Sequence, residues 1–264
     1  MVPMGERPGW FDWSVLRVKR FVALSLFVVC ASAVFSFWLL GQPGAGARTA
    51  AFLPPRAGVK LQPGPDGLAT AVNVTRSPDA EWLGTAAAHT GIPARALRAY
   101  VNAAVAANES APACGIGWNT LAAVGFVESA HGTYGGGSLS SAGQASGPIV
   151  GPSLNGAGFA AIADTDGGAL DGDAGWDHAV GPMQFIPSTW RIAGMDGNGD
   201  GAADPFNIDD AALSAATYLC GRGRDLTTAQ GWTAAIYAYN QSDAYIRQVS
   251  SQATAYAAKA GTAG

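Results

Sequence analysis

Twenty consecutive residues without a charged side chain, from Phe21 to Leu40, follow directly after Arg17, Lys19 and Arg20. As an α-helix, such a run is about 30 Å long, which matches the hydrocarbon core of a bilayer. Basic residues before an apolar span favour a cytoplasmic N-terminus and place the following chain outside. The run therefore predicts a transmembrane anchor at residues 21–40. A cleaved signal peptide is the alternative, because residues 45–47 (Ala-Gly-Ala) have small residues at the spacing of a cleavage site.

On either interpretation the working part of the chain is exported. If the run is an anchor, residues 1–20 are cytoplasmic and the protein is a single-pass membrane protein. If the run is cleaved, the protein is secreted. Residues 41–77 contain eleven Gly or Pro and no sustained apolar period, so we expect a flexible linker there. Residues 78–264 form the expected extracytoplasmic domain.

Composition excludes two broad classes of protein. With 48% hydrophobic and 13% charged residues, the chain is not of the disordered class. Its net charge of -4, with no dense basic window beyond the N-terminus, argues against a nucleic-acid partner. We expect a monomer that is attached to the membrane through residues 21–40.

Two of the three cysteines, Cys114 and Cys220, lie in the predicted external domain. Oxidising conditions outside the cytoplasm allow thiols to pair. We therefore predict a Cys114–Cys220 disulfide. Two separate buried thiols are the alternative, and a metal site is disfavoured because no CxxC or His pair accompanies them.

The domain is expected to be mainly α-helical. Apolar residues recur at four-residue spacing from Pro93 to Val105, behind a proline at a helix-opening position. A second helix is predicted from Asn119, as N-cap, to Ala130. About forty residues rich in Gly, Ser and Asp follow Gly132 and indicate a functional loop or small lobe. Further helices are predicted over residues 211–219, 227–239 and 243–258.

Glu128 is the most informative residue of the second helix. It shares one helix face with Leu121, Val124 and Gly125. Packing against apolar neighbours should raise the pKa of its carboxyl group. A carboxylic acid that stays protonated near neutral pH can donate a proton to a leaving-group oxygen. A salt-bridged or solvated glutamate near a helix end is the structural alternative.

Three motifs occur in a fixed order along this domain. They are residues 127–132 (Val-Glu-Ser-Ala-His-Gly), 181–190 (Gly-Pro-Met-Gln-Phe-Ile-Pro-Ser-Thr-Trp) and 238–242 (Ala-Tyr-Asn-Gln-Ser). Over residues 90–258 the chain resembles the lytic murein transglycosylases, most closely the membrane-bound B-type branch in its actinobacterial form. The resemblance implies a lysozyme-like domain with a cleft. It also implies peptidoglycan glycan as substrate, cut between N-acetylmuramic acid and N-acetylglucosamine.

The resemblance also implies how the site works. Glu128 is expected to be the single catalytic acid and base, and no cofactor is required for the chemistry. The substrate's own N-acetyl oxygen supplies the nucleophile, and Glu128 then takes a proton from the muramoyl 6-hydroxyl, so that a 1,6-anhydro ring forms. The expected substrate-binding residues are Ser129, Met183, Gln184, Tyr239 and Asn240.

Alternatives remain open for both the function and these residues. A hydrolytic muramidase would need a second carboxylate, and five aspartates between residues 164 and 177 precede Gln184. We expect those aspartates to brace their loop. A non-catalytic wall-binding or calcium-stabilised scaffold is the other possibility. Structurally, Gln184 is a candidate loop-bracing amide, and Tyr239 with Asn240 a helix face with its C-terminal cap.

A second acidic stretch predicts a structural calcium site. Residues 196–201 (Asp-Gly-Asn-Gly-Asp-Gly) match the opening of a calcium loop, with oxygen ligands at positions one, three and five and glycine at six. Asn207 replaces the bidentate Glu at position twelve, which lowers the expected affinity, and Asp209 or Asp210 is available to compensate. The alternative is an Asp/Gly-rich turn without metal. The predicted ligands are Asp196, Asn198, Asp200, Ala202 and Asp204.

Residues 164–168 (Asp-Thr-Asp-Gly-Gly) resemble the same pattern less well, because glycine occupies the fifth position. We therefore place the calcium site in the later loop.

Overall fold

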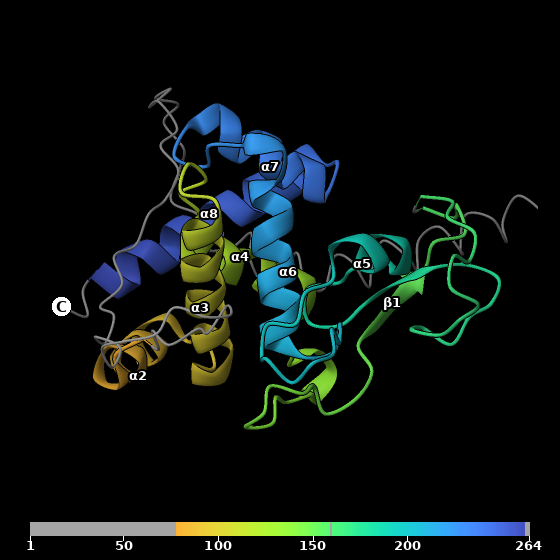
Figure 1. Ribbon diagram of the computed structural model, residues 1–264, viewed down its shortest axis with the longest axis horizontal. Coiled ribbons are helices and arrows are strands. Elements are labelled where there is room, and N and C mark those ends of the chain that lie inside the picture. The colour runs from red at the N-terminus through yellow and green to blue at the C-terminus, as the bar shows by residue number, and fades with distance from the viewer. Residues whose placement is uncertain (1–77, 159, 262–264) are drawn as a thin grey trace, which may run out of the picture. The chain divides into compact units, whose positions relative to one another are not determined.

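The computed structural model describes residues 78–158 and 160–261 (Figure 1). The predicted membrane segment and linker, residues 21–40 and 41–77, lie outside the described residues. Among the helices of the described part, none is both long and apolar enough to cross a bilayer. The domain from residue 78 onward is mainly helical, as predicted.

Four helices form the core of the domain. They are α3 (Ala94–Ser110), α4 (Trp118–Ser129), α6 (Ile208–Cys220) and α8 (Asp243–Gly261). Helix α3 packs along α6, and α4 packs against α8 and α3 (Figure 1). Alanine lines the facing sides of α3 and α6, so their backbones approach closely. Helix α4 is buried on every side in its first two turns, which makes it the centre of the core.

Shorter elements surround this core. Helix α2 (Ala80–Thr90) packs on α8 and α3, and α7 (Ala229–Tyr239) packs on α6 and α8. Strands β1 (Val150–Ser153) and β2 (His178–Val180) pair antiparallel and lead into α5 (Pro187–Ala193). The β-ribbon and its long loops extend from one side of the helices in Figure 1. This is the small lobe that the Gly- and Asp-rich stretch predicted. Two 3-10 turns, η1 (Tyr134–Gly136) and η2 (Gly221–Gly223), complete the described elements.

The predicted disulfide between Cys114 and Cys220 is confirmed. It joins the loop before α4 to the last residue of α6, across a sequence separation of 106 residues. Both cysteines are buried. Closing so long a loop restricts the unfolded chain and stabilises the domain by about 2–5 kcal/mol.

Two helix boundaries differ from the prediction. Helix α4 begins at Trp118 with Gly117 as its N-cap, so the prediction of Asn119 as N-cap is wrong. Asn119 is buried, and its Nδ2 donates to the Ala253 carbonyl of α8 at 3.1 Å, so a tertiary contact replaces the cap. Helix α6 begins at Ile208, because the Asn207 side chain caps it by accepting from the Asp209 amide.

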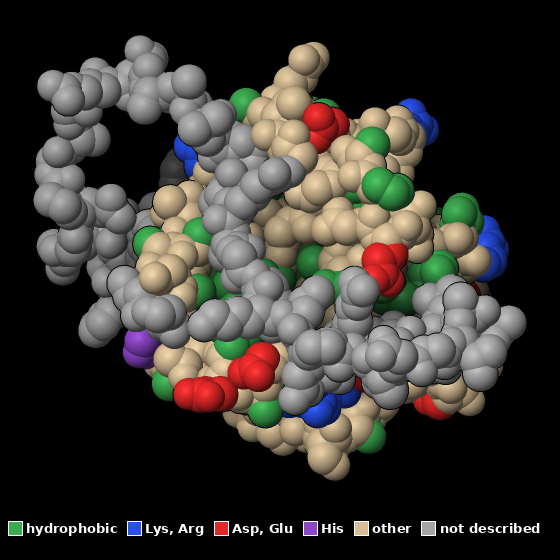
Figure 2. All heavy atoms as spheres, turned by 60° about the vertical axis from the view of Figure 1, so that its left-hand side comes forward, with side chains coloured by type: hydrophobic (Ala, Val, Ile, Leu, Met, Phe, Trp, Pro, Cys, Tyr) green, Lys and Arg blue, Asp and Glu red, His purple; other side chains and the backbone are tan. Residues whose placement is uncertain are grey.

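Charged side chains are dispersed on the face that Figure 2 draws. The acidic and basic groups of the described residues lie there in small, separate groups among apolar and neutral polar surface. The described residues visible in that view therefore form no continuous basic surface for a polyanion.

Candidate active site

Glu128 lies in the last turn of α4, between the exposed Phe126 and the buried Ser129. Leu121, Val124 and Gly125, which share its face, are all buried. Glu128 itself is partly exposed. The carboxyl group is therefore surrounded mostly by protein and still has an opening to solvent.

Burial raises the pKa of Glu128 to about 7. Desolvation of the charged form is the main cause, and a hydrogen bond from the Tyr245 hydroxyl opposes it. The raised pKa that the apolar helix face predicted is thus confirmed. A carboxyl group with this pKa can donate and accept a proton near neutral pH.

Tyr245 is the site residue that sequence reasoning missed. It is buried in the first turn of α8, and its hydroxyl donates to Glu128 Oε1 at 2.5 Å. Burial and the nearby Glu128 carboxylate raise the pKa of Tyr245 well above its ordinary value, so the phenol stays protonated and remains a donor. Its position at the head of a buried stripe on α8, with Val249 and Ala253, was the available sequence signal.

Ser129 joins the end of α4 to the Gly-Pro-Met-Gln turn. Its hydroxyl donates to the Pro182 carbonyl at 2.6 Å and accepts from the Gly132 amide at 2.8 Å. The side chain is buried. These bonds fix the turn opposite the end of the helix, and a direct contact of Ser129 with substrate stays a prediction.

The backbone directly after Glu128 is strained and supported by a buried histidine. Ala130 and His131 both have positive φ, at 51° and 64°. The His131 ring lies between two tyrosine hydroxyls, with Nδ1 3.2 Å from Tyr100 Oη and Nε2 2.9 Å from Tyr256 Oη. Burial lowers the pKa of His131 to about 4, so the ring is neutral over most of the pH range. Contacts from α3 and α8 thus hold the turn that orients Glu128.

Gln184 and Tyr239 both contact the Gly-Pro-Met-Gln turn, residues 181–184. Gln184 has a positive φ of 50°, and its Nε2 donates to the Gly181 carbonyl at 3.0 Å. The Tyr239 hydroxyl donates to the carbonyl of the buried Met183 at 2.6 Å. Both side chains therefore brace the turn, which for Gln184 is the structural alternative considered above. Their contacts with substrate stay predictions.

Asn240 is exposed and follows the last residue of α7. Its amide donates to the Ile236 carbonyl, so its backbone closes the helix. The side chain is accessible at the connection between α7 and α8, three residues before the start of α8. Its proposed contact with an acetamido group is compatible with this placement and stays a prediction.

The five aspartates of the small lobe are all used to hold its loop. Each of them accepts at least one backbone N–H bond. His178 adds a clamp, since its Nδ1 donates to the Gly151 carbonyl at 2.7 Å and its Nε2 lies 3.1 Å from Asp173. The bond to Gly151 is the largest cause of its raised pKa. These contacts favour bracing over catalysis for Asp164, Asp166, Asp171, Asp173 and Asp177.

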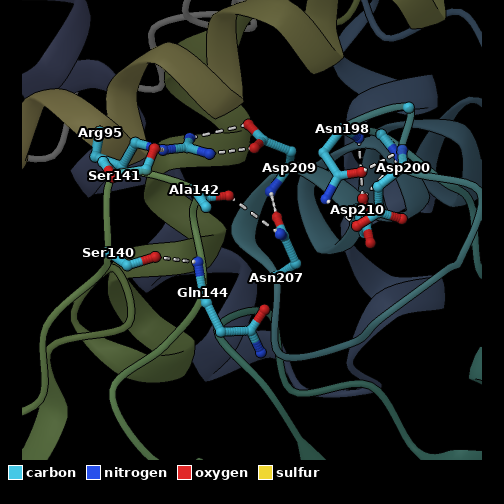
Figure 3. A network of polar contacts seen from close by, with 12 residues as sticks. Arg95, Ser140, Ser141, Ala142, Gln144, Asn198, Asp200, Asn207, Asp209 and Asp210 are labelled. Carbon is cyan, nitrogen blue, oxygen red and sulfur yellow. Dashed lines mark hydrogen bonds and ion pairs between the residues drawn. The ribbon is translucent and has the colours of Figure 1, made fainter.

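The predicted calcium loop is held by its own hydrogen bonds. Asp196 accepts from the amides of Gly199 and Gly201 at 2.7 and 2.8 Å. The buried Asp210 accepts from the amides of Gly197, Asn198 and Asp204. Figure 3 shows Asp210 beside Asn198. Burial raises the pKa of Asp210. Asn207, at position twelve, caps α6 and donates to the Ala142 carbonyl, so its side chain is used elsewhere.

The described residues bring three carboxylates together in a different place. Oxygen atoms of Asp164, Asp166 and Asp177 lie within 4.8 Å of one another. This is the loop that the sequence pattern ranked second. The difference arises because Asp177, which lies outside the local pattern, folds back onto Thr165 and joins the two earlier aspartates.

We expect Glu128→Gln to increase the stability of the domain at alkaline pH. The folded-state pKa of Glu128 lies above its unfolded value, so the cost of the buried charge grows as pH rises from about 4.5 to about 7. The neutral amide removes that cost, which amounts to at most about 3 kcal/mol. Denaturant unfolding at pH 8 and pH 4 measures it.

The difference between the two proteins should vanish near pH 4, where Glu128 is protonated in both states. The titrations of His131 and His178 are common to both proteins and cancel in the comparison. Equal stability at pH 8 would show that the carboxylate is well solvated.

The calcium prediction has a direct test. Calcium at millimolar concentration is expected to release or absorb heat on binding and to raise the melting temperature, because an ion bound only to the folded state stabilises it. Asp196→Asn should weaken both effects. If Asp164→Asn weakens them instead, calcium binds in the loop that contains Asp164. If the unmutated protein shows no heat of binding and no change in melting temperature, the calcium prediction is wrong and both loops are hydrogen-bonded turns without metal.

In a comparison with known proteins, one family model matches part of the domain. Residues 159–234 match the model described as "Transglycosylase SLT domain". The match includes the motif at residues 181–190, begins after Glu128 and ends before Tyr239. No curated protein matches the chain.

A solved structure that is similar to this chain is the Escherichia coli lytic transglycosylase SLT35 in complex with bulgecin A. The similarity covers 68% of this chain and 75% of the other, with 13% sequence identity and a TM-score of 0.40.

Proposed function

We propose that the protein is a lytic transglycosylase that cleaves the β-1,4 bond between N-acetylmuramic acid and N-acetylglucosamine in peptidoglycan. One observation carries the proposal: a single carboxyl group, Glu128, has a pKa of about 7 and is oriented by a tyrosine hydroxyl. The family match over residues 159–234 supports the same class of enzyme. The B-type branch and the lysozyme-like superfamily, which the three motifs suggested, form part of this proposal.

In the first step Glu128 acts as a general acid. Its protonated carboxyl group donates to the glycosidic oxygen while the substrate's acetamido oxygen attacks the anomeric carbon. The glycosidic bond breaks, and the proton leaves with the alcohol of the departing sugar. Tyr245 holds the carboxyl group through Oε1, which leaves the other oxygen available for the transfer.

In the second step the Glu128 carboxylate acts as a general base. It takes the proton of the muramoyl 6-hydroxyl, whose oxygen then attacks the anomeric carbon and releases the acetamido oxygen. The product is a 1,6-anhydro end, and Glu128 regains its proton. The exposed Asn240, together with Gln184 and Tyr239 at the braced turn, is assigned to hold the acetamido group.

The substrate-assisted route is favoured over hydrolysis by the surroundings of Glu128. A hydrolytic muramidase needs a second carboxylate near the scissile bond. The pKa of Glu128 responds to burial and to Tyr245, and no carboxylate of the described residues contributes to it. The aspartates of the small lobe are meanwhile committed to backbone amides.

We further propose that the enzyme works outside the cytoplasm as a monomer. The Cys114–Cys220 disulfide supports the location outside the cytoplasm, because such bonds persist in oxidising compartments. The charge-free run at residues 21–40 would anchor the enzyme in the membrane, or would direct secretion if it is cleaved.

Digestion of purified peptidoglycan tests the reaction. We expect products with 1,6-anhydro ends, which mass spectrometry distinguishes from reducing ends because they are lighter by one water molecule. Glu128→Gln should lower the rate by roughly 100- to 10,000-fold, the usual contribution of acid–base catalysis. Its binding to peptidoglycan, and a melting temperature no lower than that of the unmutated protein, serve as controls. Ordinary reducing ends would indicate a muramidase, and binding without any lysis by the unmutated protein would indicate a scaffold.

Tyr245→Phe should move the alkaline limb of the kcat/KM profile to higher pH. The mutation removes the hydrogen bond that lowers the pKa of Glu128, so the acid form persists to a pH higher by about one unit. The rate at the optimum should fall, because the carboxyl group loses its orienting donor. Tyr237→Phe, at an exposed tyrosine of α7, is the matched control. An unchanged pH profile in Tyr245→Phe would remove Tyr245 from the site.

A further inference from the structure

A groove of about 360 Å³ lies along the segment that follows Glu128. Its lining consists of Gly132, residues 134–137 and residues 145–150. This volume is at the lower end of the range for small-molecule sites. The lining contains no charged side chain, and its largest side chain, Tyr134, is 77% exposed.

Hydrogen bonds connect the two ends of the groove to the end of α4 and to the segment before the Gly-Pro-Met-Gln turn. At one end, Gly132 is bonded through its amide to Ser129, the residue after Glu128. At the other end, the Ile149 carbonyl accepts from the Gly181 amide at 2.8 Å, and Val150 pairs with Val180. The groove therefore lies between the segment that follows Glu128 and the segment that leads into the Gly-Pro-Met-Gln turn.

The core holds residues 141–145, the segment that leads into one wall of the groove. The Arg95 guanidinium donates to the Ser141 carbonyl and pairs with Asp209, and Asn207 donates to the Ala142 carbonyl (Figure 3). Ala145, which lines the groove, is held in the same way, because its amide donates to the Phe206 carbonyl. Since Arg95 is neutralised by its partner, the support of the wall adds no free positive charge to the groove.

The lining favours an uncharged ligand. A charged group that entered the groove would lose water without gaining an opposite charge, which is costly. An N-acetylhexosamine has an acetamide and hydroxyls that backbone groups and the Ser146 hydroxyl can satisfy, and an apolar ring face that suits the exposed ring of Tyr134. Glycines 135, 136 and 147 leave the groove open, since a Cβ at any of these positions would meet no atom within 4 Å.

We propose that this groove binds one uncharged N-acetylhexosamine of the glycan strand, beyond the bond that is cut, with Tyr134 as its stacking surface. The charged stem peptide of the wall is not its ligand. This inference rests on the proposed function, since it names where that substrate continues past Glu128.

Blocking the groove at Gly147 tests the proposal. Gly147 has an ordinary φ and open space on the side where a Cβ would lie, so Gly147→Trp fills the groove without straining the fold. Chitotetraose, an uncharged N-acetylglucosamine oligomer, is the probe, and calorimetry on the full chain carrying Glu128→Gln measures binding without cleavage. We expect Gly147→Trp to weaken binding at least about tenfold. Tyr134→Ala should also weaken binding, whereas Tyr134→Phe, which keeps the aromatic ring, should not.

Gly84→Trp, on an exposed face of α2 with equal free space, is the matched control and should leave binding unchanged. Equal affinity of Gly147→Trp and its parent for chitotetraose would overturn the proposal, as would the absence of chitotetraose binding at millimolar concentration. An effect of Gly147→Trp confined to peptide-bearing strands would instead assign the groove to the stem peptide. Because binding is measured without turnover, a failure to find 1,6-anhydro products would contradict the proposed function and leave this result standing.

Discussion

The hydrogen bond between Glu128 and Tyr245 connects the two helices on which the proposed site depends. Helix α4 brings the carboxyl group out of the core, and α8 returns after more than a hundred residues to place a phenol against it. Burial alone would raise the pKa of Glu128 further, and the phenol limits that rise. The two opposing effects leave the carboxyl group able to act as acid and then as base at one pH.

The surroundings of this pair are rigid where the chemistry needs orientation. Three non-glycine residues with positive φ, Ala130, His131 and Gln184, occur in the two segments that flank Glu128. Such conformations cost about 1–3 kcal/mol each and persist only when neighbouring contacts hold them. The His131 ring between two tyrosines and the Ser129 hydroxyl on Pro182 provide those contacts. Among the described residues Arg222, in η2, is the other non-glycine residue with a positive φ, so three of these four positions flank the carboxyl group.

Local patterns in the sequence predicted much of the fold and the central acid. Apolar periodicity indicated α3, α4, α6, α7 and α8, and the helix face of Glu128 predicted its raised pKa. Helices α2 and α5 and the β1–β2 ribbon were not predicted, because α2 is alanine-rich with weak periodicity and the others are short.

Long-range contacts set the limits of prediction at the site. Tyr245 is separated from Glu128 by 117 positions, so no local pattern links the two. Asn119 has the residue type of an N-cap, yet a partner on α8 takes its side chain into the core. The grouping of Asp177 with Asp164 likewise depends on how the loop folds back. By contrast, the disulfide was predictable, because only two cysteines were available outside the apolar run.

The absence of a side chain at Gly125 has a consequence for the whole site. A Cβ there would lie 2.1 Å from Tyr100 Oη and 3.2 Å from Met183 Sδ. Even a methyl group would therefore have to displace the phenol that contacts His131 and the residue whose carbonyl anchors Tyr239. Position 125 is closed to every larger amino acid unless both flanks of the acid move together, so one missing methyl group sets how near the two halves of the site can come.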